Sequence, residues 1–201
     1  MKQARKEDRR VVRTKQAISH ALVALISKRG FEDLTVQDIL EEANVGRSTF
    51  YAHFEDKEDV LLQGLEELQR ALSQRQQQAL LDVDGLDARA LVFSQELFAH
   101  AHSHRALFEA MVGRRSGALV MGHFQTMLVA LVKAEVTAMV ASAGGNKAGR
   151  LPPEGVTQFV AGGLFGLLTW WMRDHRSRLG VADINAMFRT LAIPALRSAV
   201  R

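Results

Sequence analysis

Apolar residues recur three and four positions apart along most of the chain, which is the spacing of one face of an α-helix. The pattern predicts helices over about residues 13–28, 35–43, 47–53, 57 onward, 87–104, 105–112, 119–143, 154–179 and 183–200. Loop signals separate several of them, at 82–85, 113–117 and 144–155. The last of these loops, with two prolines, is the best candidate for a mobile surface loop. Because no segment shows a strand pattern and no repeat is present, the sequence predicts an all-α protein of about nine helices.

The segment from Thr35 to Lys57 predicts two short helices joined by a tight turn. Thr35 has a hydroxyl that can cap the first helix, whose apolar residues share one face. In the turn, Asn44 tolerates the left-handed backbone that stops a helix, and Gly46 lets the next helix begin. These features predict a helix-turn-helix.

The second helix of this pair carries a polar outer face. Phe50 and Phe54 lie four residues apart and should face inward together. The residues left outside are Arg47, Ser48, Thr49, Tyr51 and His53. Their hydrogen-bond donors suit DNA bases and phosphates, so this surface indicates DNA binding.

The run T-V-x-D-I-x-x-x-A-x-V-x-x-S-T-F-Y-x-H-F-x-x-K-E-x-L-L, from Thr35 to Leu62, closely resembles the DNA-binding domain of the TetR family of bacterial repressors. Family members usually have Gly at the position of Asn44 and Ser at the position of Gly46. Asn44 keeps the turn feasible, whereas Gly46 gives up a side-chain cap, so we expect a looser start of the recognition helix. Beyond Leu62 the resemblance is only architectural.

The resemblance implies a set of DNA contacts. The positions that commonly hold phosphates in the family correspond here to Thr35, Ser48, His53 and Lys57. On the outer face of the second helix, the residues expected to approach base edges or the flanking backbone are Arg47, Thr49 and Tyr51, with Gln37 on the first helix as a secondary candidate. Arg47 has the donors to grip guanine.

Charge is concentrated at the N-terminus. The net charge is +4, and the first 15 residues hold seven basic residues against two acidic ones. A basic arm ahead of a helix-turn-helix can neutralise phosphates or enter a minor groove. The alternative is a solvated, disordered tail.

The apolar segment from Val156 to Met172 is too short and too interrupted for a membrane span, which needs about 20 apolar residues. Its glycines allow another helix to pack closely. In the TetR family the last two helices pair with those of a second subunit, so the resemblance implies a dimer interface centred on Gly162, Gly166, Leu167, Met187 and Leu191. The alternative is a buried helix of a monomer.

Large aromatic rings and methionines in the central helices suggest an apolar effector cavity, because methionine side chains adapt to varied shapes. The resemblance also implies a small effector. The predicted walls are Phe108, Met111, Phe124 and Met127 on one side and Trp170 or Trp171 on another, with polar contacts from His100, His104 and His123. The alternative is a solid core without a cavity.

Other chemistry has little support in the sequence. His100 and His104 lie four residues apart and could share a metal ion, but no further ligand follows at a matching spacing, so no metal site is expected. No phosphate loop, nucleophile elbow or Cys-His pair is present, so no catalysis and no cofactor are expected. The absence of cysteine and the charged N-terminus are typical of a cytoplasmic protein without a signal peptide.

The sequence therefore predicts a homodimeric transcriptional regulator with a helix-turn-helix domain at about residues 1–60 and a helical effector and dimerisation domain at 61–201. An effector would release it from a palindromic operator. Two alternatives stay open: a DNA-binding protein of the same fold without an effector, acting structurally or by recruiting a partner, and a metal-responsive switch. The effector, the operator, the regulated genes and the sign of regulation do not follow from the sequence.

Overall fold

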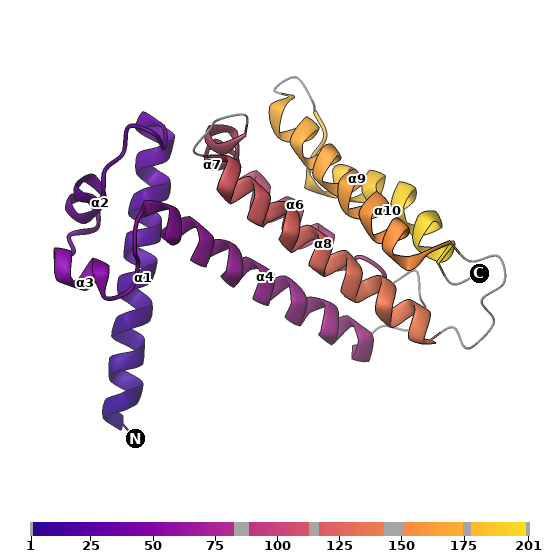
Figure 1. The fold of residues 1–201 in the computed structure, drawn as a ribbon, viewed down its shortest axis with the longest axis horizontal. Helices are drawn as coiled ribbons and strands as arrows, with labels where there is room; N and C mark the ends of the chain where they lie inside the picture. Colours follow the sequence, from indigo (N-terminus) through magenta and orange to yellow (C-terminus); the bar gives the residue numbers. More distant parts are fainter. Residues whose placement is uncertain (1, 83–88, 113–116, 143–150, 175–177, 200–201) are drawn as a thin grey trace. The chain divides into compact units, whose positions relative to one another are not determined.

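The structure, a computed structural model, describes residues 2–82, 89–112, 117–142, 151–174 and 178–199. Within these ranges the chain forms nine helices and no strand (Figure 1). The helices are α1 (Lys2–Arg29), α2 (Val36–Ala43), α3 (Arg47–Tyr51), α4 (Lys57–Asp82), α6 (Phe93–Ser103), α7 (Arg105–Met111), α8 (Gly117–Ser142), α9 (Pro153–Arg173) and α10 (Val181–Arg197). The all-α prediction is confirmed.

Three helix boundaries differ from the predicted ones by more than three residues. Helix α1 begins at Lys2 rather than near residue 13, because lysine, arginine, glutamine and alanine favour a helix even without an apolar face. The predicted basic arm is therefore helical. Helix α6 begins at Phe93 rather than near residue 87, and α9 ends at Arg173 rather than near residue 179. Most of the predicted loops at 82–85, 113–117 and 144–155 lies outside the described residues.

The contacts divide the chain into two compact units. The first comprises residues 1–66 and 106–121, and the second comprises 67–105 and 122–201. The sequence predicted a single division near residue 60, and it did not predict that the segment 106–121 belongs with the N-terminal residues. Helices α4 and α8 each contribute residues to both units.

The core of the first unit is built by the apolar face of α1 and the helix-turn-helix. Phe31, Ile39 and Phe50 are fully buried in it, and Phe54 packs beside Phe50 with ring centroids 5.6 Å apart. Met111, at the end of α7, belongs to the same core. The inward orientation predicted for the two phenylalanines is confirmed.

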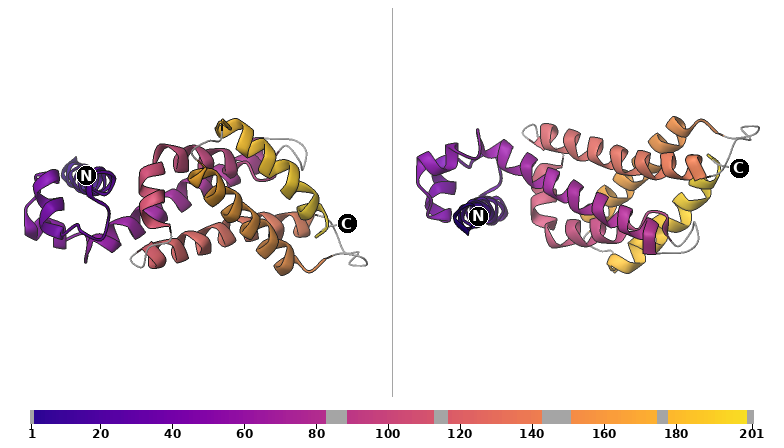
Figure 2. Two further views of the ribbon diagram at one scale, coloured as in Figure 1. Left: turned by 90° about the horizontal axis from the view of Figure 1, so that it is seen from above. Right: turned by 90° about the horizontal axis from the view of Figure 1, so that it is seen from below.

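The second unit packs α6 against both α9 and α10, which lie side by side (Figure 2). An aromatic cluster joins the three helices, with Phe98 5.9 Å from Trp171 and 6.1 Å from Phe188 between ring centroids. The Trp171 indole N–H donates to the Leu179 carbonyl at 3.0 Å. This bond holds the chain beyond the end of α9.

Polar groups are also enclosed in the second unit. The Ser94 hydroxyl lies 2.6 Å from Asn185 Oδ1, and Gln76 donates to Glu135 at 3.2 Å. Glu135 is almost fully buried, and the loss of solvation raises the pKa of its carboxyl. Close by in the chain, Leu91 takes a left-handed backbone (φ 57°), and its carbonyl accepts from Ser94.

Helix α8, and not the segment considered from the sequence, has the length and composition of a membrane span. Its most apolar stretch has a mean hydropathy of 1.4, and 44% of that stretch is buried inside the protein. Core helices of soluble proteins share these properties, so the observation is weak evidence for a membrane.

Candidate DNA-binding site

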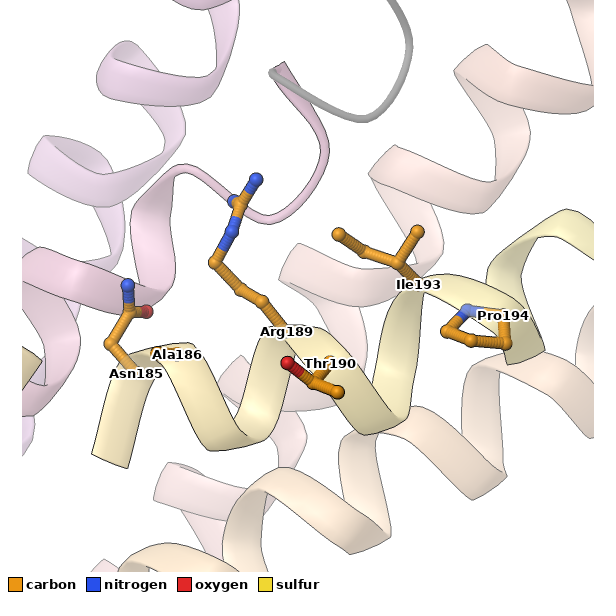
Figure 3. A pocket seen from close by; sticks show the side chains of 6 residues that line it. All are labelled: Asn185, Ala186, Arg189, Thr190, Ile193 and Pro194. Carbon is orange, nitrogen blue, oxygen red and sulfur yellow. The ribbon is translucent and has the colours of Figure 1, made fainter. Parts of the chain in front are cut away.

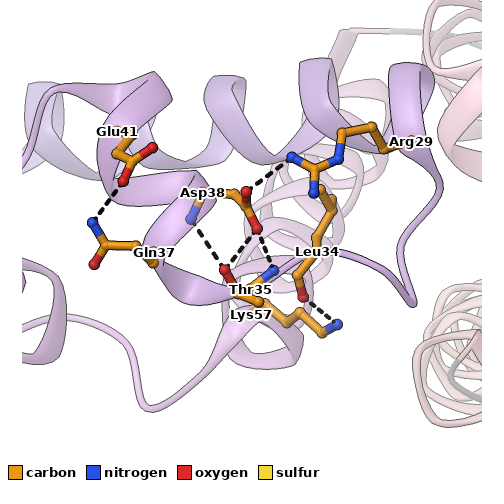
Figure 4. Close-up of polar contacts among 7 residues, drawn as sticks. All are labelled: Arg29, Leu34, Thr35, Gln37, Asp38, Glu41 and Lys57. Carbon is orange, nitrogen blue, oxygen red and sulfur yellow. Dashed lines mark hydrogen bonds and ion pairs between the residues drawn. The ribbon is translucent and has the colours of Figure 1, made fainter.

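The first helix of the motif is fixed by a capping box. The Thr35 hydroxyl accepts from the Asp38 backbone N–H at 3.2 Å, and Asp38 Oδ2 accepts from the Thr35 backbone N–H at 2.8 Å (Figure 4). Arg29 of α1 donates to the other carboxylate oxygen at 2.8 Å. The hydrogen bonds from Thr35, with that from Arg29, lower the pKa of Asp38 to about 2.

The turn has the predicted geometry. Asn44 is left-handed (φ 51°, ψ 49°), and its backbone N–H donates to carbonyls at the end of α2. Val45 packs partly buried against the core. Gly46 caps α3 without a side-chain hydrogen bond, as its lack of a side chain requires. The prediction of a left-handed Asn44 is confirmed.

Helix α3 is held to the protein by Phe50, which is fully buried. Arg47, Ser48 and Thr49 are exposed. Tyr51 is also exposed, and its ring lies edge-to-face with that of Phe50, with the ring centroids 5.3 Å apart. His53, just after the helix, is half-buried. The donors that the sequence placed outside are therefore at the surface, and their contacts with DNA stay predictions.

Arg47 does not stand alone on this surface. Its Nη2 donates to Gln37 Oε1 at 3.1 Å, and Gln37 Nε2 donates to Glu41 Oε1 at 2.9 Å. Sequence reasoning named Arg47 and Gln37 but missed Glu41. The signal that could have found it is the four-residue spacing of Gln37 and Glu41 on one helix face.

Two of the predicted phosphate contacts have their donors occupied. The Thr35 backbone N–H and hydroxyl both donate to Asp38. The Lys57 ammonium donates to the carbonyls of Phe31, Glu32 and Leu34 at 2.9, 3.3 and 2.7 Å, which uses its three protons. Figure 4 shows the bond to Leu34. Either residue has to exchange these bonds for a phosphate if it is to contact DNA.

The residues predicted to line an effector cavity belong to different units. Met111 lies in the core of the first unit, together with the segment that carries Phe108. In the second unit, Phe124, Met127 and Trp171 are buried, whereas Trp170 is 46% exposed. The described contacts join Trp171 to Phe98 and His102, and Phe124 to Phe165. An effector cavity with these walls stays a prediction.

The histidines in and just after α6 stack on other aromatic rings. His100 and His104 stack with centroids 4.3 Å apart, and His102 stacks on Trp171 at 5.5 Å. Reduced solvation and the neighbouring His104 lower the pKa of His100 to about 4. His123 of α8 is exposed. No group of three or more metal-ligating side chains occurs among the described residues.

The residues predicted for a dimer interface lie at the surface of the second unit. A Cβ atom added at Gly162 or Gly166 of α9 would meet no neighbouring atom within 4 Å. Met187 and Leu191 of α10 are exposed, and Leu167 is half-buried. Phe159, which sequence reasoning missed, is 68% exposed. The apolar surface of these two helices is therefore larger than predicted.

Open depressions mark the same two helices. One is lined on α10 by Asn185, Ala186, Arg189, Thr190, Ile193 and Pro194 (Figure 3). Another is lined at the end of α9 by Phe165, Gly166, Thr169, Trp170, Arg173 and Asp174. Each has a volume of about 500 Å³ and is open to solvent. The second includes Trp170 and Gly166, which the sequence had assigned to an effector cavity and to the dimer interface.

Comparisons with known proteins agree with this geometry. Residues 18–63 match the family described as bacterial regulatory proteins, tetR family. An uncharacterized HTH-type transcriptional regulator of Bacillus subtilis, YxbF, is 42% identical over 55 residues. These residues are 27% of this chain but only 14% of that relative.

Solved structures resemble the whole fold. A TetR-family regulator from Syntrophomonas wolfei has a TM-score of 0.76 at 17% identity, covering 92% of this chain and 95% of its own. The regulator FadR from Bacillus subtilis, in complex with stearoyl-CoA, has a TM-score of 0.62 at 19% identity, covering 92% and 97%. At these identities the likeness shows the fold alone.

A helix-turn-helix unit at the N-terminus, followed by a second helical unit, gives this chain the fold of a helix-turn-helix transcriptional regulator. Within that class, the match over residues 18–63 identifies the helix-turn-helix segment as one of the TetR type. Regulators of this family bind DNA, usually as dimers, and are normally not enzymes.

Proposed function

We propose that this protein is a cytoplasmic, homodimeric repressor that binds a palindromic DNA operator and leaves it when a small apolar effector binds. The observation that carries the DNA-binding part is the outer face of α3. Its polar side chains are exposed, while the buried Phe50 holds the helix in place. A short helix of this kind fits the major groove with its donors toward the bases.

The contacts divide into base-directed and phosphate-directed ones. Arg47 carries a guanidinium whose fork of donors matches guanine, and Thr49 and Tyr51 extend the same face. Ser48 and His53 flank it, where phosphates would lie. Thr35 and Lys57 support the motif through their own hydrogen bonds and add phosphate contacts only if those bonds open.

The dimer is supported by the apolar surface of α9 and α10. Phe159 and Leu191 are both more than two-thirds exposed in the single chain, and exposed apolar residues on two neighbouring helices favour contact with another protein surface. Burying these surfaces against a second copy by two-fold symmetry removes them from solvent and sets two recognition helices about 34 to 36 Å apart, as successive major grooves require.

Effector control is supported by the ligand in the related fold. The FadR structure from Bacillus subtilis holds stearoyl-CoA. In this chain Phe124, Met127 and Trp171 supply buried apolar side chains in the second unit. An effector that binds more tightly to a conformation with mismatched recognition helices would shift the dimer away from operator binding.

The function is tested by selection from a pool of randomised duplexes with the full-length protein. We expect enrichment of a palindrome, and Arg47→Ala should lower the affinity for it by about 1 to 3 kcal/mol with relaxed preference at one base pair. An equal loss on all duplexes would contradict a base contact by Arg47. Failure to enrich any sequence would refute sequence-specific DNA binding.

Dimerisation is tested by sedimentation of the wild type and of Gly166→Leu at micromolar concentration. The added side chain should separate the paired helices and lower both the dimer population and the operator affinity. A matched control is Gly64→Leu on α4, a glycine with equally open surroundings outside the proposed interface. A monomeric wild type would overturn the dimer.

Effector control is tested by a thermal-shift screen of apolar carboxylates, acyl thioesters and aromatic compounds, followed by DNA release with each compound that raises the melting temperature. Stabilisation together with release supports the proposal. If no compound releases the operator, the protein is a DNA-binding factor without an effector. Release by metal salts alone would indicate the metal-responsive switch.

A further inference from the structure

Glu41 completes a chain of hydrogen bonds on the DNA-facing surface of the motif. The chain runs from the Arg47 guanidinium at the start of α3, through the Gln37 amide, to the Glu41 carboxylate at the end of α2. All three side chains are exposed, and Figure 4 shows the contact between Gln37 and Glu41. The donor–acceptor distances of 3.1 and 2.9 Å are those of good hydrogen bonds.

The chemistry of Arg47 and Glu41 fixes the orientation of the Gln37 amide between them. A guanidinium only donates hydrogen bonds, and a carboxylate only accepts them. The Gln37 amide has one oxygen and one nitrogen, so only one orientation satisfies both neighbours. The flipped amide would set donor against donor at Arg47 and acceptor against acceptor at Glu41. Glu41 therefore determines which atom of Gln37 faces Arg47.

The same bonds fix the orientation in which the Gln37 amide could meet a base. A glutamine that recognises adenine uses its amide oxygen and nitrogen together. In this structure the oxygen is bonded to Arg47 and the nitrogen to Glu41. Gln37 is thus a bridge between the two charged groups, and its amide keeps one acceptor site and one N–H that a base could still meet.

We propose that Glu41 is a positioning residue for Arg47: acting through Gln37, it holds the guanidinium ready to donate its remaining N–H groups to a guanine. This inference rests on the proposed base contact of Arg47. A long arginine side chain loses conformational freedom when it binds, and a side chain already held in place loses less. The expected advantage is about three- to tenfold in affinity for the preferred base pair.

The charge of Glu41 gives the proposal a distinctive signature. A carboxylate near DNA repels phosphates whatever the sequence, so its removal should strengthen binding to an unrelated duplex. Removal should also weaken the preference for guanine, because Arg47 is no longer held. A residue that served only to support the fold would lower both affinities when replaced.

The experiment uses the full-length protein, the duplex selected from the random pool, the same duplex with each base pair changed in turn, and a scrambled duplex. Glu41→Met removes both the charge and the acceptor, whereas Glu41→Gln removes the charge but keeps an amide oxygen that can accept from Gln37. We expect Glu41→Met to lower the preference at the base pair that depends on Arg47 by a factor of about three to ten. Glu41→Gln should retain most of it.

The matched control is Glu42→Met. Glu42 is the next residue of α2 and is exposed, but its described ion pair is with Lys28 of α1 at 3.7 Å. It loses the same charge outside the chain of hydrogen bonds, so we expect stronger binding to the scrambled duplex with unchanged base preference. In the Arg47→Ala background, Glu41→Met should cause no further loss of preference, because the group that it positions is absent.

The possible outcomes distinguish failure of the base contact by Arg47 from failure of the positioning role of Glu41. If Arg47→Ala changes no base preference, the base contact fails and the role of Glu41 fails with it. If Arg47→Ala lowers the preference and Glu41→Met does not, only the positioning role is overturned. A uniform loss on all duplexes, together with a lower melting temperature for Glu41→Met, would assign Glu41 to the support of the fold and would also overturn the inference.

Discussion

The helix-turn-helix motif and the second unit connect their polar groups over different distances along the chain. In the motif of the first unit, Thr35 bonds Asp38 three residues away, and Arg47 bonds Gln37 ten residues away. In the second unit, Ser94 bonds Asn185 across 91 residues, and Gln76 bonds Glu135 across 59. The DNA-binding motif is thus specified by one short segment, whereas the second unit depends on pairs that are distant in sequence.

The carboxyl groups of the two units show the same contrast. Asp38 lies at the surface, where donors close in the chain favour its charged form and lower its pKa. Glu135 lies in the core, where burial outweighs its hydrogen bonds and raises its pKa. The first unit therefore places a charge where the Thr35 hydroxyl and backbone and the Arg29 side chain stabilise it, and the second encloses an acid whose charge is costly.

The largest expected effect is in the core of the second unit. Trp171→Ala removes a ring that is 1% exposed and bonds the Leu179 carbonyl, so it should lower the free energy of unfolding by about 3–5 kcal/mol. Urea unfolding measures it. The control is Trp170→Ala, whose loss should be smaller and should depend on protein concentration if Trp170 lies near a dimer interface. Equal, concentration-independent losses would show that the core does not depend on Trp171.

In the first unit, Lys57→Met should lower the free energy of unfolding by about 1–3 kcal/mol, because three carbonyls of the segment 31–34 lose their donor. The control Lys28→Met breaks only an exposed ion pair and should cost less than about 1 kcal/mol. Operator binding measured against salt should keep its slope. A slope reduced by one contact would instead place Lys57 against a phosphate.

The turn tests how strictly the motif is specified by local backbone geometry. Asn44→Ala puts an ordinary side chain at φ 51° and should cost about 1 kcal/mol. Asn44→Gly should cost little, since glycine adopts this conformation freely. Thermal unfolding of the two variants measures the difference. Equal losses would mean that the Asn44 side chain, rather than its backbone, stabilises the turn.

Glu135→Gln tests the enclosed acid of the second unit. Between the ordinary pKa of 4.5 and the raised value in the folded protein, the folded state holds a proton that the unfolded chain releases, so wild-type stability falls as pH rises. The variant lacks this titration. The melting temperature of the variant, relative to that of the wild type, should therefore increase as the pH rises above 4.5. A constant difference across this range would contradict the raised pKa.

The smallest effect is expected for His100. Its pKa is about 4 in the folded protein against an ordinary 6.5, so the unfolded chain binds a proton first as pH falls. Stability should be complete above pH 6.5 and decrease toward pH 4. The side chain keeps much of its solvent contact, so the decrease is small. His100→Gln should flatten the dependence of the melting temperature on pH in this window, and an unchanged dependence would contradict the lowered pKa of His100.

The parts that the sequence predicted are those governed by near neighbours. The helices of the motif, the left-handed Asn44 and the inward Phe50 follow from spacings of a few residues. The sequence showed that Lys57 carries donors, but not that carbonyls more than 20 residues earlier would occupy them. In the same way, the sequence did not show that the Trp171 indole N–H would donate to the Leu179 carbonyl eight residues later, because this bond is not part of the helical periodicity.

The candidate site was predicted in its residue types but not in its connections. The sequence does not predict a hydrogen bond between an exposed arginine and a glutamine ten residues away, because the bond depends on the angle at which α2 and α3 meet. That angle is set by the backbone at Asn44 and by packing around Phe50. Glu41 was missed because an acidic residue is not an obvious member of a surface that binds a polyanion.

Helix α3 is attached to the protein by the burial of one side chain, while its first three residues are exposed to solvent. Substitutions at those three positions carry little penalty for folding, so natural variation can accumulate there while the scaffold is conserved. If these positions contact DNA as proposed, a duplicated gene for this protein is free to acquire a new DNA target through a few surface changes, and descendants with nearly the same fold can come to control different genes.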